Sequence, residues 1–251
     1  EKEDWNKQTV AKHWKVKDVV AHLLDGNMRI LSGLRDDHPI PGPEINSYKD
    51  LVTHINALNA EWVKAMKRIS PEVLISLLKF TSEPVYEYYT SLELFAKAKY
   101  AVAWAGETES TNWMHIARDY TEKFLHQQQI RAATKRPGII TSEYFIPFID
   151  VCMYAMPYTL KNIRPHNGSI LKVKITGDVQ AMWHFEYNGR KWQRIDNNFE
   201  YNVVSTVSID THAAWKLFSK SLRPQEVLDK IDIIGSKEIG EQAIEMVSFM
   251  S

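Results

Sequence analysis

The chain reads Trp14-Lys15-Val16-Lys17-Asp18-Val19-Val20-Ala21-His22-Leu23-Leu24 near its start, and this stretch predicts the first long helix. From Lys17 to about Gly33, apolar side chains recur every three or four residues, so that they line one face of the helix. Asn27 is the single polar residue on that face. His22 lies beside the same face at the middle of the helix, away from its exposed ends, as a buried site residue would.

Four further helices are predicted before residue 165. Ser47 and Ser70 are good N-cap residues, because a short hydroxyl side chain accepts a hydrogen bond from the free N–H groups of a first turn. Pro71 suits the first position of a helix, where its missing N–H costs nothing. The helices expected are 47–69, 71–90, 112–133 and 142–160.

From residue 168 the pattern changes to an alternation typical of strands. Asn188-Gly189 lies between two such segments and predicts a tight hairpin turn, since both residues accept a positive φ at low cost. The fold class expected is α+β, with a helical bundle over residues 1–165 and a small α+β domain over residues 166–251. In the second domain we expect strands at 169–176, 181–187, 191–195, 201–209 and 230–234, and helices at 211–222 and 236–249.

Composition excludes several classes of protein. The net charge of +0 gives no general attraction to nucleic acid or to an anionic membrane, and the longest apolar runs are far shorter than the ~20 residues that span a bilayer. The single cysteine, Cys152, rules out an intrachain disulfide, and we expect it to pack rather than to act as a nucleophile. We therefore expect a cytoplasmic protein with neither a nucleic-acid nor a membrane partner. The chain also lacks the Gly-rich phosphate loop and the GxSxG turn.

The helix expected at 112–133 carries the most informative polar residues. Glu122 and His126 are four residues apart, so both side chains project from one face and can bind one metal ion. His115 and Asp119 extend the same polar stripe, in which we count no Lys or Arg. The other interpretation is a solvated surface, and periodicity alone favours it. The apolar face almost opposite the stripe consists of Trp113, Ile116, Ala117, Tyr120 and Phe124.

Two motifs resemble a known family. The stretch from Trp14 to Leu23 resembles the W-x-V-x-D-V-x-A-H-L start of DinB-like proteins, and Glu122-Lys123-Phe124-Leu125-His126 is similar to their later E-x-x-x-H motif. Within the DinB-like superfamily, the chain most resembles the mycothiol-dependent maleylpyruvate isomerase family. The resemblance implies a bundle in which His22, Glu122 and His126 bind a divalent metal ion, usually Zn2+. It also implies a C-terminal domain similar to sterol-carrier-protein-2.

The resemblance implies a chemistry as well. A low-molecular-weight thiol would act as cofactor, bind the metal as a thiolate and attack a small electrophilic substrate, as in an isomerase or S-transferase. Family members anchor a substrate carboxylate with an arginine of the C-terminal domain, for which Arg190, Arg194 and Arg223 are candidates here. His115 and Asp119 either orient a ligand or lie at the surface.

Two other functions stay open on the sequence. The chain could be a non-catalytic module that binds a metal or an apolar ligand, or a metal-dependent hydrolase in which the open metal position activates water. For the enzyme we expect a partly open pocket between the bundle and the C-terminal domain, because an open coordination position is useful only where a substrate can reach it. Arg190, Trp192 or Arg194 would lie on its rim.

Overall fold

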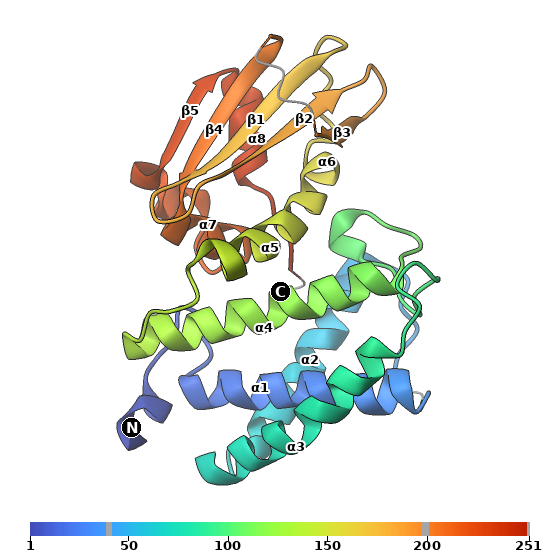
Figure 1. The fold of residues 1–251 in the computed structure, drawn as a ribbon, viewed down its shortest axis with the longest axis vertical. Helices are drawn as coiled ribbons and strands as arrows, with labels where there is room; N and C mark the ends of the chain where they lie inside the picture. Colours follow the sequence, from blue (N-terminus) through green and yellow to red (C-terminus); the bar gives the residue numbers. More distant parts are fainter. Residues whose placement is uncertain (39–41, 197–200, 250–251) are drawn as a thin grey trace. The chain divides into compact units, whose positions relative to one another are not determined.

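The computed structural model describes residues 1–38, 42–196 and 201–249, which form two compact units (Figure 1). One unit comprises residues 1–101 and 109–137 and is helical. The other comprises residues 102–108 and 138–249 and contains the sheet. Contacts within the chain therefore group the helices after residue 138 with the sheet. The domain boundary that we expected between residues 165 and 166 stays a prediction.

The helical unit is built around its first long helix, which contacts each of the other three. That helix continues into a π-helical segment, Ile30–Arg35, before it ends. Two short hydroxyl side chains start the next two helices as predicted. Ser47 Oγ accepts from the Asp50 N–H at 3.1 Å, and Ser70 Oγ accepts from the Val73 N–H at 3.3 Å. The helices are α1 (Val16–Arg29), α2 (Tyr48–Met66), α3 (Pro71–Thr90) and α4 (Asn112–Thr134).

The core of this unit lies along the inner face of α1. Leu24 is 1% exposed and packs with Leu74 of α3, which is 0% exposed. Burial of such side chains stabilises a fold by about 1.5–3 kcal/mol each. Apolar residues of the other elements close the cluster: Trp5, Trp62, Met66, Ile69, Leu78 and Ile130.

The second unit is a five-stranded mixed sheet with helices. The strand order is β3-β2-β1-β4-β5; β1 and β4 are parallel and the other neighbours are antiparallel. Phe148, Phe185 and Trp215 are among its fully buried side chains. Its main elements are α5 (Ser142–Cys152), α6 (Met156–Thr159), β1 (Ser169–Thr176), β2 (Ala181–Tyr187), β3 (Trp192–Ile195), β4 (Val203–Asp210), α7 (Thr211–Phe218), β5 (Ile231–Gly235) and α8 (Lys237–Ile244).

The predicted hairpin connects β2 to β3, with its tip one residue later than expected. The Asn188 N–H donates to the Lys191 carbonyl at 3.1 Å, which leaves Gly189 and Arg190 at the tip. Gly189 has φ +84°, a conformation in which a side chain would be strained. The Asn188 side chain instead accepts hydrogen bonds from the N–H groups of Arg190 and Lys191.

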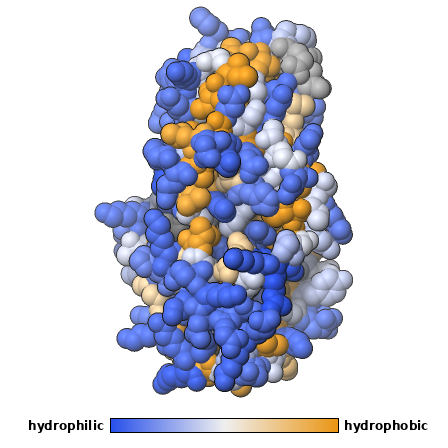
Figure 2. All heavy atoms as spheres, turned by 90° about the vertical axis from the view of Figure 1, so that its left-hand side faces the viewer, coloured by the Kyte–Doolittle hydropathy of each residue, from blue (hydrophilic) through white to orange (hydrophobic). Residues whose placement is uncertain are grey.

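In the view of Figure 2 the surface of the helical unit is mostly hydrophilic with scattered apolar residues, and the larger apolar areas lie over the unit that contains the sheet. Among the described residues, none of the helices combines the length and the apolar character needed to cross a bilayer.

Candidate metal centre

The first half of the site depends on how α1 begins. The Asp18 carboxylate accepts a hydrogen bond from the Lys15 N–H at 3.0 Å and so caps the first turn. One turn later the Ala21 carbonyl accepts a hydrogen bond from the Trp62 indole at 2.8 Å, which fixes α1 against α2. The first of these contacts explains why an acidic residue lies four positions before His22.

Trp14 forms a wall beside the histidines. Its ring centroid lies 4.7 Å from that of His22 and 5.9 Å from that of His126. The preceding segment holds it in place, because the Trp14 carbonyl accepts hydrogen bonds from Gln8 Nε2 at 2.9 Å and Thr9 Oγ1 at 2.7 Å. An indole in this position keeps bulk water away from one side of both imidazoles.

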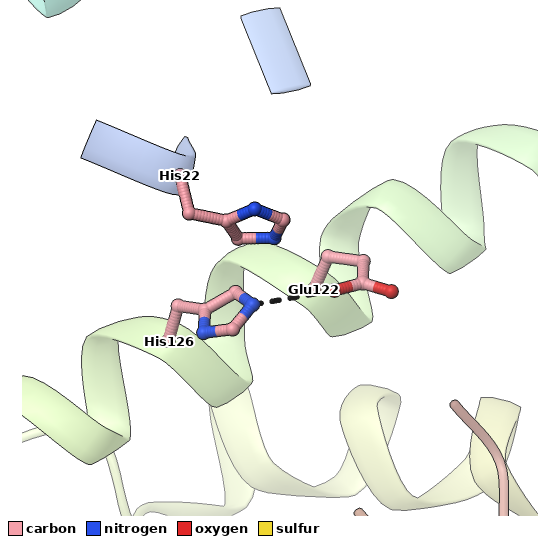
Figure 3. A group of neighbouring side chains, drawn as sticks. All are labelled: His22, Glu122 and His126. Atoms are coloured by element: carbon pink, nitrogen blue, oxygen red, sulfur yellow. Dashed lines mark ion pairs between the residues drawn. The ribbon is translucent and has the colours of Figure 1, made fainter. Parts of the chain in front are cut away.

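The structure brings His22, Glu122 and His126 together (Figure 3). His22 comes from α1, and the other two come from successive turns of α4. One ligand atom of each residue lies within 4.8 Å of the other two, and His126 Nε2 is 3.4 Å from Glu122 Oε2. This convergence is the arrangement that the two sequence motifs predict, while metal binding by these residues stays a prediction.

The donor set fits a divalent metal ion. Two imidazoles and one carboxylate are ordinary zinc ligands, and bonds of ~2.0–2.1 Å in a tetrahedral site put neighbouring ligand atoms ~3.3–3.5 Å apart. The 3.4 Å separation of His126 Nε2 and Glu122 Oε2 has that value. Figure 3 shows His22 Nε2 on the side of the ring that faces Glu122 and His126, whereas Nδ1, which has no hydrogen-bond partner among the described residues, points away from them.

Gln129 orients His126. Its side-chain oxygen lies 2.9 Å from His126 Nδ1. An amide oxygen can only accept, so His126 Nδ1–H donates to it, which leaves Nε2 as the ring nitrogen that faces Glu122. Histidines that bind a metal ion through one ring nitrogen commonly donate a hydrogen bond from the other ring nitrogen. The sequence analysis missed Gln129, although its i, i+3 spacing from His126 was available as a signal.

Burial sets the charge of the site. It lowers the pKa of His22 to about 3, with the neighbouring His126 acting in the same direction, against the opposing charge of Glu122. Burial alone would raise the pKa of Glu122. The hydrogen bond and charge of His126 outweigh it, so this pKa lies below its ordinary value. At neutral pH the site therefore presents a neutral His22 imidazole and a carboxylate, the forms that bind metal ions.

The interpretation of the polar stripe of α4 as a solvated surface is wrong. His115 is 8% exposed and His126 is 6% exposed. Of the five residues expected on the apolar face, only Phe124 is fully buried. Helical periodicity identifies only one covered side, but buried residues occur around much of α4: Met114, His115, Thr121, Phe124, Leu125, His126, Gln128 and Gln129.

His115 and Asp119 lie outside the group that could hold a metal. Burial lowers the pKa of His115 to about 4, and the charge of Arg118 adds to the effect, so His115 is neutral at pH 7. Asp119 forms an ion pair with Lys123. The count of no Lys or Arg on the stripe was also wrong, because Arg118 lies one turn before Glu122 on the same side of α4.

Two of the three arginines proposed to reach the site from the C-terminal domain have partners within their own unit. Arg194 pairs with Asp150 at 2.8 Å, and Arg223 pairs with Glu245. Trp192 is 2% exposed and donates its indole N–H to the Ile163 carbonyl at 2.8 Å. Arg190 is exposed at the hairpin tip. A role for any of them at the metal centre stays a prediction.

The sequence of the helical unit matches a family model, the mycothiol maleylpyruvate isomerase N-terminal domain, over residues 1–131. The chain belongs to this family. The predicted family and the α+β fold class are thereby confirmed. The search of curated proteins finds no match to the chain.

Solved structures extend the likeness in fold. The crystal structure of a mutant of the mycothiol-dependent maleylpyruvate isomerase overlays with a TM-score of 0.53 at 8% sequence identity, covering 93% of this chain and 83% of that one. Sterol carrier protein-2 like-3 from Aedes aegypti overlays on 39% of this chain with a TM-score of 0.28 at 15% identity, covering 93% of its own. The sterol carrier protein domain 2 of Helicoverpa armigera covers 41% of this chain and 91% of its own, with a TM-score of 0.27 at 17% identity.

Proposed function

We propose that this protein is a divalent-metal-binding, thiol-dependent isomerase or S-transferase that acts on a small electrophilic substrate. The observation that carries the proposal is the set of three ligand atoms from His22, Glu122 and His126 within 4.8 Å of one another. Membership of the maleylpyruvate isomerase family supports a thiol as the second component. Three protein ligands leave a zinc ion at least one open position, as catalytic sites require.

The residues of the chain prepare this site for a thiol. A bound divalent cation would lower the pKa of a thiol and hold it as the thiolate, its nucleophilic form. The Gln129 oxygen keeps His126 Nε2 directed at the site. Trp14 excludes water from one side, which strengthens electrostatic interactions inside.

The reaction balances without an external oxidant or reductant. A thiol bound here would supply a thiolate that adds reversibly to one carbon of an activated double bond while the π electrons shift onto the conjugated carbonyl. Rotation about the former double bond and return of the electrons would release the thiolate and give the isomer. In a transferase the carbon next to the carbonyl would take a proton, or a leaving group would depart, and the C–S bond would be kept.

Metal content tests the proposal directly. We expect protein purified without chelator to contain about one divalent ion per chain and His126→Ala to lose it, by elemental analysis. His166→Ala removes an exposed histidine of the other unit and is the matched control. A metal-free wild type, or a His126→Ala variant with full metal content, would overturn the proposal and favour a non-catalytic module.

A thiol assay then separates the enzyme classes. The metal-loaded protein should accelerate the reaction of small thiols with electrophilic alkenes, or the cis–trans isomerisation of such alkenes in the presence of a thiol. Hydrolysis of esters or amides at a rate independent of thiol would instead identify a metal-dependent hydrolase.

A further inference from the structure

Arg118 is the nearest positively charged residue before Glu122 on α4. It precedes Glu122 by four residues, so the two side chains start one above the other, about 5–6 Å apart at Cβ. Arg118 is half-buried, and within the described part of the chain its guanidinium has no ion-pair or hydrogen-bond partner. A guanidinium has five N–H donors. Because half-burial removes part of the water that would solvate its charge, an anionic partner is favoured.

Two further polar groups lie on this side of α4: His115, three residues before Arg118 on the same helix, and Tyr89 of α3, whose ring centroid lies 5.9 Å from Lys123 Nζ of α4. We call Arg118, His115 and Tyr89 the Arg118 cluster. The Tyr89 hydroxyl is buried beside Asp119 and makes no hydrogen bond of ordinary geometry there. Burial, together with the charge of Asp119, raises its pKa, so it keeps its proton and can donate. His115 is buried and neutral, with one ring nitrogen that can also donate.

The charges nearby leave Arg118 uncompensated. Asp119, the adjacent acid, forms its ion pair with Lys123 instead. The Glu122 carboxylate is attracted by Arg118 but lies beyond ion-pair distance of its guanidinium. This carboxylate belongs to the group of three residues that could hold a metal ion. A divalent ion with Glu122 and a thiolate would be neutral as a group, which leaves the positive charge of Arg118 for a further anion.

We infer that the Arg118 cluster binds a carboxylate of a ligand held at the metal centre. The inference rests on the proposed function and deepens it, because it adds a binding residue supplied by the bundle itself. A guanidinium with a phenol and an imidazole beside it offers mostly donors, and a carboxylate accepts from all of them, bidentately from the arginine. The carboxylate belongs either to the thiol or to the electrophile, two sources with the same chemistry.

Two pairs of probes distinguish the sources. The first pair is 3-mercaptopropionate and 3-mercaptopropan-1-ol, thiols with and without a carboxylate. The second is propionate and propionamide, added to protein already saturated with 3-mercaptopropan-1-ol. Isothermal titration of zinc-loaded full-length protein gives the four affinities. Preference for the acid in the first pair assigns the carboxylate to the thiol, and preference only in the second pair assigns it to the substrate.

The variants are Arg118→Gln and Arg118→Lys, with Arg68→Gln as the control at an exposed arginine of the same unit. We expect Arg118→Gln to weaken binding of the carboxylate probe about 10–100-fold, the usual value of a hydrogen bond to a charged group, and to leave the neutral probe unchanged. Arg118→Lys should fall between, because it keeps the charge and loses the bidentate geometry. Circular dichroism and zinc content check that each variant is folded and loaded.

Each result decides one question. Equal effects of Arg118→Gln on charged and neutral probes, or no effect on either, overturn the inference while zinc binding leaves the proposed function standing. The inference also fails if the wild type does not distinguish acid from neutral probe in either pair. A wild type that binds no zinc overturns the proposed function, and the inference falls with it.

Discussion

Helices α1 and α4 both supply residues of the candidate metal centre, yet their buried faces differ in kind. The buried residues of α1 are mostly apolar, such as Val19 and Leu24. Those of α4 include histidine, threonine and glutamine, such as His126 and Gln129. Apolar burial stabilises the unit, whereas buried polar side chains cost free energy unless they are paired. The comparison indicates that α1 contributes mainly to folding and α4 mainly to the chemistry of the site.

The largest effect is expected from Leu24→Ala in α1. The side chain is 1% exposed, and its removal from a packed core should lower the free energy of unfolding by about 2–5 kcal/mol, measured by urea denaturation of metal-free protein. Leu23→Ala, at the neighbouring half-buried position, is the control and should cost less. Equal losses at both positions would contradict the burial pattern of α1.

Next in size is a change in metal affinity from Gln129→Leu in α4. Loss of the hydrogen bond to His126 Nδ1 frees the imidazole to rotate or change tautomer. Zinc affinity should fall about 10–100-fold, measured by competition with a chelator. Gln127→Leu alters an exposed glutamine of the same helix and should leave the affinity unchanged. If Gln129→Leu chiefly destabilises the metal-free fold, the contrast between α1 and α4 is lost.

His115 gives a smaller, pH-dependent effect. Burial lowers its pKa to about 4 in the folded chain, from an ordinary value of 6.5. Between these values the unfolded chain takes up a proton that the folded chain does not, so stability falls as pH falls from 6.5 toward 4. The slope from one such group is at most about 1.4 kcal/mol per pH unit.

Substitution tests this assignment. In the presence of chelator, His115→Leu should show a shallower loss of stability than the wild type between pH 6.5 and 4, by urea denaturation at several pH values. His166→Leu, at an exposed histidine, should keep the wild-type slope. A slope unaffected by His115→Leu would mean that His115 is not held neutral by burial.

The smallest effect is expected at the start of α1. Asp18→Ala removes the acceptor of the Lys15 N–H and should cost about 1 kcal/mol of stability. Asp18→Asn keeps an acceptor oxygen and should recover most of the loss. Thermal unfolding followed by circular dichroism measures both. If Asp18→Asn is as unstable as Asp18→Ala, the negative charge rather than the hydrogen bond supports the helix.

Local rules predicted much of the fold. The bounds expected for α3, β1 and β2 agree with the structure, because Pro71 fixes a helix start and strict alternation marks strands. The end of the helix expected at 142–160 was less accurate. It divides into α5, a 3-10 turn and α6, with Pro147 inside α5 and Pro157 within α6. The energetics of a proline inside a helix depend on its neighbours, which a sequence does not show.

The site was predictable only in part, for a physical reason. Spacing brings Glu122 and His126 onto one face, and its mid-helix position makes His22 the best candidate for a third ligand, but only the resemblance pairs the two motifs in one site. The burial of α4 could not be predicted either, since a polar helix face becomes buried only through partners distant in sequence. Arg118 lies one turn before Glu122, and Gln129 lies almost one turn after His126. A search around the E-x-x-x-H motif would include both positions.

The three residues proposed as metal ligands belong to segments separated by about a hundred residues. An ion bound by His22 and His126 would therefore act on the chain as a removable cross-link, closing a loop that contains all of α2 and α3. For a covalent bridge, a loop of this length restricts the unfolded chain by about 4–5 kcal/mol. Loading with metal would thus protect helices that contribute no ligand, and their resistance to proteases would follow the metal supply.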